Sequence, residues 1–317
     1  MSNLQTILRS PGAKLGAFGA VLAVALGGGA LVGATLGPDA PTTTEMADHQ
    51  SDAGETPAVP ADQQPPAGLA ISQGGYTLDL RTPVVAGGGP AELALVIEGP
   101  DGRGVTDFDV EHDKELHLIV VSRDLARYAH VHPTRDDAGV WTVTVPTLDP
   151  GSYRVFADFT PTGDDGVTLG ADLTVPGDHA PVSLPAPSTD ATIDGFDVSF
   201  DGELVASTES ELTVTVTADG EPVTDLQPYL GSLGHLVAIR NGDMAYLHVH
   251  PLDETDGPGG PQVRFAVEVP TAGTYRLFFD FSHGDEVRTA ATTIGARAGA
   301  PTADDDTPPA EHDAHEG

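Results

Sequence analysis

The stretch LHLIVVSRDLARYAHVHP (residues 116–133) returns 118 residues later as GHLVAIRNGDMAYLHVHP (residues 234–251). Each copy has an apolar, β-rich run, six residues suited to a turn, and a second run in which Tyr and two His alternate with apolar residues. Alternation with a period of two is typical of a β-strand. Proline donates no hydrogen bond to a sheet, so Pro133 and Pro251 should end the second strand. The stretch therefore predicts one β-hairpin in each half of the chain.

The similarity extends beyond the hairpins and indicates an internal duplication. Residues 105–133 align with 223–251 without a gap, and VPTLDPGSYRVFADF (145–159) matches VPTAGTYRLFFDF (269–281) after a two-residue deletion. Short β-rich runs are separated by Gly, Pro and Asp, and no amphipathic helix interrupts them. We expect an all-β fold with two tandem immunoglobulin-like or cupredoxin-like β-sandwich modules, at 74–176 and 191–296. The alternating residues of the late strand, Tyr153, Val155, Ala157 and Phe159, should pack in the core.

The segments outside the two modules differ from them in composition. Residues 1–37 carry Arg9 and Lys14 before 23 uncharged residues, a length that can cross a bilayer as a helix. This segment predicts an N-terminal membrane anchor or a cleaved signal peptide, with the rest of the chain facing outward. The expected location is the cell membrane, single-pass with an extracellular C-terminal part, and secretion is the alternative. The remaining segments are predicted as a disordered, acidic, Pro-rich spacer (38–73), a linker (177–190) and a disordered acidic tail (297–317).

Composition excludes several classes of site and partner. The chain of 317 residues has no cysteine, so it has neither disulfides nor thiolate metal ligands. Its formal net charge of −34 repels phosphate backbones, so nucleic acid is not an expected partner. An acidic surface attracts cations, but solvation alone accounts for the same charge.

The simplest hairpin register brings three histidines together in each module. If the pairing is symmetric about the turn, residue 121 faces 128, residue 119 faces 130, and His117 faces His132, with His130 two residues along on the same face. The second copy places His235, His248 and His250 in the same arrangement. A slip of one residue would send His117 to the opposite face and destroy the cluster.

Three neutral imidazoles that reach one point form a candidate transition-metal site. Imidazole binds Zn²⁺, Cu²⁺, Ni²⁺ and Fe²⁺, and three of them leave a fourth position open. Asp158 and Asp280 are candidate fourth ligands, although a surface or turn carboxylate is the favoured interpretation of both. Without cysteine or a matched methionine in the two copies, Cu(II) and Zn are the first choices. The alternatives are a hydrogen-bonded structural corner and a pH-sensitive contact. His112, His179 and His283 have no counterpart in the other copy and are weak candidates.

The residues HLIVVSRDLARYAHVHP and GHLVAIRNGDMAYLHVHP resemble a family of secreted or membrane-anchored actinobacterial proteins. Members carry tandem immunoglobulin-like modules with a His-x-His-Pro hairpin and are often described as hypothetical or heavy-metal-binding. The modules are also distantly similar to periplasmic copper-carrier sandwiches, although this chain lacks the Met-rich segment of many copper carriers. The resemblance covers about residues 90–295 and implies extracellular association with metal, without any catalytic residue.

Taken together, the sequence predicts an extracytoplasmic binding protein that holds copper or zinc for buffering or delivery. The expected partners are the metal ion and the membrane, and the sequence identifies no partner protein. We do not expect an enzyme, because no G-x-S-x-G elbow, P-loop, H-E-x-x-H helix or Rossmann glycine pattern occurs. The alternatives are a structural or adhesive surface protein whose histidines serve packing, and a His-based metalloenzyme.

Overall fold

The computed structural model describes residues 65–253, 255 and 257–299, and none of these residues is helical. No helix long and apolar enough to cross a membrane was found among them. The predicted anchor or signal segment (1–37), most of the predicted spacer and most of the predicted tail lie outside the described residues.

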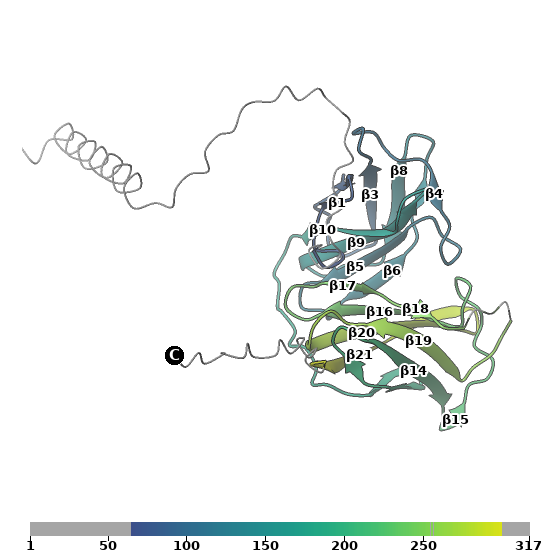
Figure 1. Ribbon diagram of the computed structural model, residues 1–317. Coiled ribbons are helices and arrows are strands. Elements are labelled where there is room, and N and C mark those ends of the chain that lie inside the picture. Colours follow the sequence, from purple (N-terminus) through teal and green to yellow (C-terminus); the bar gives the residue numbers. More distant parts are fainter. Residues whose placement is uncertain (1–64, 254, 256, 300–317) are drawn as a thin grey trace, which may run out of the picture. The chain divides into compact units, whose positions relative to one another are not determined.

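The first module is built from two antiparallel sheets (Figure 1). One sheet has the order β1-β2-β3-β8-β7, and the other has the order β10-β9-β5-β6, with β4 paired to β9. The strands are β1 (Ser72–Gln73), β2 (Tyr76–Leu80), β3 (Ala91–Glu98), β4 (Phe108–Asp109), β5 (His117–Ser122), β6 (Tyr128–Val131), β7 (Thr134–Arg135), β8 (Val140–Val145), β9 (Gly151–Pro161) and β10 (Val167–Val175).

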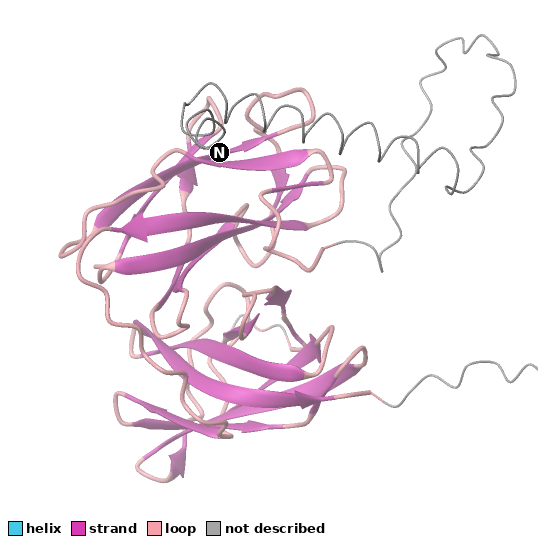
Figure 2. Cartoon of the chain, turned by 90° about the vertical axis from the view of Figure 1, so that its left-hand side faces the viewer, coloured by secondary structure: helices cyan, strands magenta, loops and turns pink. Residues whose placement is uncertain are grey.

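The second module repeats this plan, except that one short strand, β13 (Leu204–Val205), pairs in parallel with its neighbour. Its sheets have the orders β11-β12-β14-β19-β18, with β15 on β14, and β13-β21-β20-β16-β17. The strands are β11 (Asp190–Ile193), β12 (Phe196–Asp201), β13 (Leu204–Val205), β14 (Glu209–Ala218), β15 (Glu221–Pro222), β16 (His235–Arg240), β17 (Tyr246–His248), β18 (His250–Pro251), β19 (Gln262–Glu268), β20 (Gly273–His283) and β21 (Glu286–Arg297). Figure 2 shows the two sandwiches without a helix in the described residues, so the all-β fold with two tandem sandwich modules is confirmed.

Each module has its own core between its two sheets. The four alternating residues of β9 that were expected to be core all belong to the core cluster of the first module: Tyr153, Val155, Ala157 and Phe159. The Tyr153 hydroxyl donates to the Asp149 carbonyl at 2.8 Å, and Tyr275 donates to the Thr271 carbonyl at the same distance. A tyrosine bonded to backbone a few residues upstream is a feature of immunoglobulin-like sandwiches.

A third apolar cluster joins the hairpin sheets of the two modules. Leu118 and Val120 of β5 point into the core of their own module, but the intervening Ile119 and Val121 pack in this third cluster. The cluster also contains Phe156 from β9 and, from the second module, Val237, Ile239, Met244, Tyr246 and Phe278. Because both faces of β5 are buried, its sequence is a continuous apolar run without alternation.

The segment before β1 contacts both modules. The Gly68 amide donates to the Thr168 carbonyl at 3.0 Å, and the Tyr246 amide donates to the Ala67 carbonyl at 3.0 Å. Gly170 permits this close approach, because a Cβ atom there would lie 2.1 Å from the Gly68 carbonyl oxygen. Residues 65–73, assigned to the spacer from sequence, thus include backbone that is hydrogen-bonded to both sandwiches.

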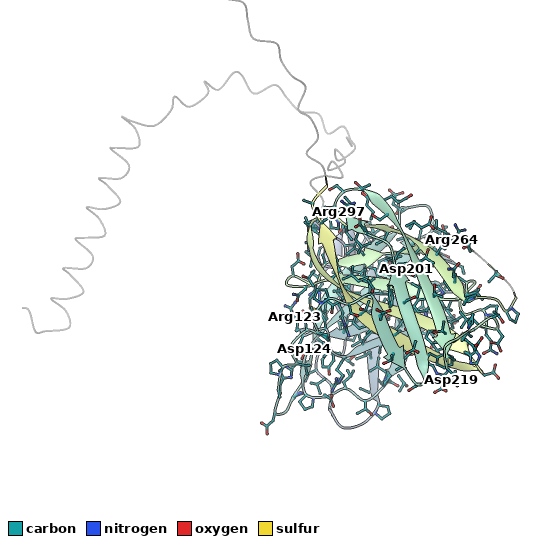
Figure 3. The ribbon with its side chains drawn as sticks, turned by 90° about the horizontal axis from the view of Figure 1, so that it is seen from below. Arg123, Asp124, Asp201, Asp219, Arg264 and Arg297 are labelled. Atoms are coloured by element: carbon teal, nitrogen blue, oxygen red, sulfur yellow. The ribbon has the colours of Figure 1, made fainter. Side chains whose placement is uncertain are left out.

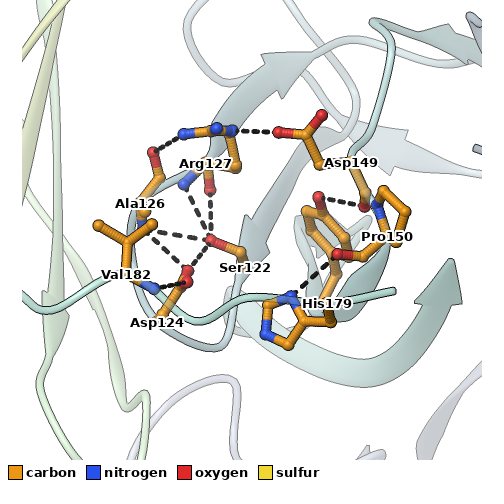
Figure 4. A network of polar contacts seen from close by, with 9 residues as sticks. Ser122, Asp124, Ala126, Arg127, Asp149, Pro150, His179 and Val182 are labelled. Carbon is orange, nitrogen blue, oxygen red and sulfur yellow. Dashed lines mark hydrogen bonds and ion pairs between the residues drawn. The ribbon is translucent and has the colours of Figure 1, made fainter. Parts of the chain in front are cut away.

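Part of the linker between the modules is fastened to the first module by the network in Figure 4. Asp124 lies in the β5–β6 turn, and its Oδ2 accepts the Val182 amide at 2.9 Å. The His179 Nδ1 donates to the Pro150 carbonyl at 2.9 Å. The linker is therefore held to the first module at two points, Asp124 and Pro150.

Charged side chains lie on the outside of the sandwiches. Figure 3 shows Asp201, Asp219 and Arg264 on the second module, and all three are exposed. Arg264 pairs with Asp253 at 2.8 Å. Exposed pairs of this kind contribute little to stability.

Candidate metal site

The first hairpin has the register expected from its sequence. Val121 pairs with Tyr128, Ile119 pairs with His130, and Leu118 pairs with Val131. Val131 packs against the module core, whereas Tyr128 packs against the cluster between the modules. The strand ends before Pro133, and the chain then crosses to the other sheet as β7. His117, His130 and His132 consequently project from one face of the hairpin.

These three imidazoles lie close enough to share one ion. One ligand atom from each of His117, His130 and His132 lies within 4.8 Å of the other two. The ring centroids are 5.4 Å apart for His117 and His130, 5.0 Å for His117 and His132, and 4.8 Å for His130 and His132. We call these three residues the triad.

Two members of the triad belong to a chain of polar contacts. His117 Nε2 donates to the Glu111 carbonyl at 3.0 Å, His117 Nδ1 and His130 Nε2 lie 3.1 Å apart, and His130 Nδ1 lies 3.0 Å from Asp280 Oδ2. With its proton on the outer nitrogen, each neutral ring turns the lone pair of its inner nitrogen toward the other ring. A metal cation could be bound between these two inner nitrogens.

The third member has a nitrogen with no hydrogen-bond partner. His132 Nε2 is buried, and no described residue accepts from it or donates to it. Burial, reinforced by the neighbouring His130 and His117, lowers the pKa of His132 to about 2. Burial likewise lowers the pKa of His117 to about 4, although its bond to Glu111 opposes the shift. Both rings therefore favour the neutral form, which is the form that binds metals.

The second module repeats part of this arrangement. His235 Nε2 donates to the Tyr229 carbonyl at 2.8 Å, which matches the bond between His117 and Glu111, and burial lowers its pKa to about 4. His248 pairs with Val237, as the predicted register requires. His250 opens β18 (His250–Pro251), which pairs with β19 in the other sheet. The side chains of His248 and His250 lie outside the described residues, so a second triad remains a prediction.

The two candidate carboxylates are buried, so the interpretation as surface or turn residues was wrong. Asp158 is 7% exposed in the middle of β9, and Asp280 is 2% exposed in the middle of β20. Each accepts a threonine hydroxyl from the adjacent strand of its own module: Thr168 at 2.9 Å for Asp158 and Thr289 at 2.5 Å for Asp280.

Each carboxylate also accepts a tyrosine from the other module. The Tyr128 hydroxyl donates to Asp280 at 3.1 Å, and the Tyr246 hydroxyl donates to Asp158 at 3.5 Å. Burial, with the adjacent carboxylate, raises the pKa of both tyrosines well above the usual value. Both hydroxyls accordingly remain protonated donors, and the polar contacts of the two hairpins cross the junction in both directions.

His112, a weak candidate in the sequence because it has no counterpart in the other copy, lies close to histidines of both modules. Its ring centroid lies 5.2 Å from that of His235 and 6.2 Å from that of His117. A cavity of about 20 Å³, roughly the volume that one water or one ion needs, adjoins these rings. Its polar lining consists of His112, His117, His130, Asp158, His235 and Tyr246. Only proximity in the fold identifies His112, because nothing in its sequence neighbourhood marks it.

One family model matches both modules. The family is described as a domain of unknown function (DUF8832), and the matches cover residues 71–176 and 191–298, together about two thirds of the chain. A search of curated proteins found no match.

Several solved structures are similar to this chain, at low identity and low TM-score. FdeC, an adhesin of Escherichia coli, is 15% identical with a TM-score of 0.24, over 73% of this chain and 66% of the adhesin chain, which is just under two thirds of its length. A chimeric tandem of the titin domains Z1 and Z2 is 14% identical with a TM-score of 0.19, over 70% of this chain and 97% of its own. The tandem Ig repeats of Dlar are 11% identical with a TM-score of 0.19, over 70% and 98% of the two chains. Identities and scores this low say nothing about function.

Proposed function

The chain belongs to the DUF8832 family, and we propose that it is an extracytoplasmic protein that holds a divalent transition metal for buffering or delivery. The ligands in the first module are His117, His130 and His132. The observation that carries this proposal is the convergence of three imidazoles within 4.8 Å, one of which has a buried nitrogen without a hydrogen-bond partner. The extracytoplasmic location is proposed from residues 1–37, as an anchor or as a signal peptide.

The donor set favours copper(II) or zinc. Three imidazoles without thiolate suit both ions and leave one coordination position for water or a carboxylate. The outer nitrogen of His117 donates to a backbone carbonyl and that of His130 faces a carboxylate, the two kinds of partner that hold metal-binding histidines in place. The corresponding residues His235, His248 and His250 are proposed as a second site on the basis of the duplication.

Metal content and thermal unfolding of the purified full-length chain test the proposal. After loading with Zn²⁺ or Cu²⁺ and dialysis, the wild type should retain metal, and Tm should rise with the free metal concentration, since the ion binds the folded state. His130→Ala should lose the first site. The matched control is His179→Ala, because the side chain of His179 is exposed. Its hydrogen bond is to the backbone carbonyl of Pro150. A wild type that retains neither metal and gains no stability from either would refute the proposal.

A second candidate role is a hydrogen-bonded structural corner. The chain of contacts from Glu111 through His117 and His130 to Asp280 favours it, because a buried polar network can fix a junction without any ion. In that case His130→Ala should lower the stability of the protein equally with and without added metal. The same thermal unfolding series therefore separates the two roles.

A further inference from the structure

Asp280 belongs to the second module, but its carboxylate meets a histidine of the first. Its Oδ2 lies 3.0 Å from His130 Nδ1, and the two side chains are only 3% and 6% exposed. These residues are 150 positions apart in the sequence. The contact therefore exists only because the two hairpin sheets pack together.

The carboxylate is held rigidly at this position. Thr289 donates to its Oδ1 at 2.5 Å, and Tyr128 donates to its Oδ2 at 3.1 Å. Both oxygens have partners from defined strands, so the carboxylate has a fixed orientation toward His130. A fixed acceptor also fixes the tautomer and the plane of the imidazole that donates to it.

The orientation of His130 determines where its other nitrogen points. With Nδ1 directed at Asp280, the lone pair of Nε2 is directed at His117 Nδ1, 3.1 Å away, where the triad converges. His117 has the same pattern, since its outer nitrogen donates to Glu111 and its inner nitrogen faces His130. The difference is that Glu111 belongs to the same module as the triad, whereas Asp280 does not.

We propose that Asp280 is a positioning residue for a metal site whose three ligands lie in the other module. The site at the triad is thus a two-module site, and metal binding strengthens the junction between the sandwiches. This inference rests on the proposed function, because it describes how the same site is oriented and what its occupancy does. An ordinary buried pair would stabilise the junction without any dependence on metal.

Zinc affinity measured by chelator competition on the full-length chain tests this inference. Asp280→Asn keeps the shape of the side chain but weakens its acceptor, so the affinity of the triad for Zn²⁺ should fall about 10- to 100-fold, as for other outer-shell partners. The control is Asp225→Asn, which removes a carboxylate from an exposed pair with His283, and it should bind zinc as the wild type does.

Hydrogen exchange distinguishes a positioning role from a purely structural one, because a purely structural Asp280 would not make amide exchange depend on Zn²⁺. Zn²⁺ should slow exchange of the β20 amides in the wild type, although this strand contributes no residue of the triad or of the proposed second site. Asp280→Asn should remove this protection. If Asp280→Asn does not fold, Thr289→Val replaces it, because that variant removes the hydroxyl that donates to Asp280 Oδ1. It should weaken zinc binding about 3-fold, less than the loss of a direct outer-shell partner.

The outcomes separate the two proposals. If the folded variants keep the zinc affinity of the wild type while His130→Ala loses zinc, Asp280 has no positioning role. The proposed function is then unaffected. Failure of the wild type to bind zinc or copper would refute both.

Discussion

His112 in the first module and Leu230 in the second occupy the same position in duplicated loops, and both have a left-handed backbone, with φ of 47° and 55°. Each loop is closed by an antiparallel β-bridge at matching positions, Glu111 with Lys114 and Tyr229 with Ser232. The backbone of the ancestral loop is thus retained in both copies, while only the first presents an imidazole at this position. The two modules therefore share a scaffold but differ in the chemistry they bring to their junction.

A second difference concerns the aromatic and polar contacts that cross the junction. Tyr128 stacks on Phe278 with centroids 4.1 Å apart and planes at 7°, whereas Tyr246 and Phe156 lie 5.3 Å apart at 35°. The corresponding tyrosine–carboxylate distances are 3.1 Å and 3.5 Å. By ring geometry and by hydrogen-bond distance, the contact that Tyr128 of the first module makes with the second module is the tighter one.

The largest expected effect comes from removing the phenylalanine ring that packs against Tyr128 or Tyr246. Phe278→Ala and Phe156→Ala should each destabilise the protein by about 3–5 kcal/mol, the usual loss for a buried phenylalanine. Phe278→Ala should cost about 0.5–1.5 kcal/mol more, because it also removes the stacked pair. Urea unfolding measures both, with exposed Val287→Ala as a control expected within about 0.5 kcal/mol of wild type. A loss below about 1 kcal/mol for Phe278→Ala would contradict the packed junction.

A smaller effect should separate the two tyrosine hydroxyls. Tyr128→Phe removes a hydrogen bond to a buried carboxylate and should lower the free energy of unfolding by about 1.5–3 kcal/mol. Tyr246→Phe removes the longer contact to Asp158 and should cost about 1 kcal/mol or less, since hydrogen bonds weaken with distance. The same urea series measures both variants. Equal losses would mean that the difference in the two distances has no energetic meaning.

The smallest effect is expected from exchanging the loop residues. His112→Leu makes the first loop resemble the second, and it should change the zinc affinity of the triad by less than about 3-fold, or about 0.6 kcal/mol, because its ring centroid lies 6.2 Å from that of His117. Leu230→His is the reciprocal control. A fall of 10-fold or more in chelator competition for His112→Leu would instead make His112 a ligand.

The sequence alone determined the two strands of the first hairpin, their register and the set of three histidines that converge in the first module. These follow from local rules: the period of two along a strand, the symmetry of a hairpin about its turn, and the inability of Pro133 to continue a ladder. All the residues involved lie within the 17 positions from His117 to Pro133, so no long-range information was needed.

The surroundings of those histidines depend on how the two modules fold and pack. Asp280, Tyr246 and His235 reach the neighbourhood of the first triad because two sheets pack face to face, and sheet packing leaves no periodic signal that pairs particular residues across it. The burial of Asp158 and Asp280 has the same origin, since a polar residue in the middle of a strand is exposed or buried according to what covers that face. A continuous apolar run such as β5 is consistent with cover on both faces, but the covering partner and its side chains come only from the folded molecule.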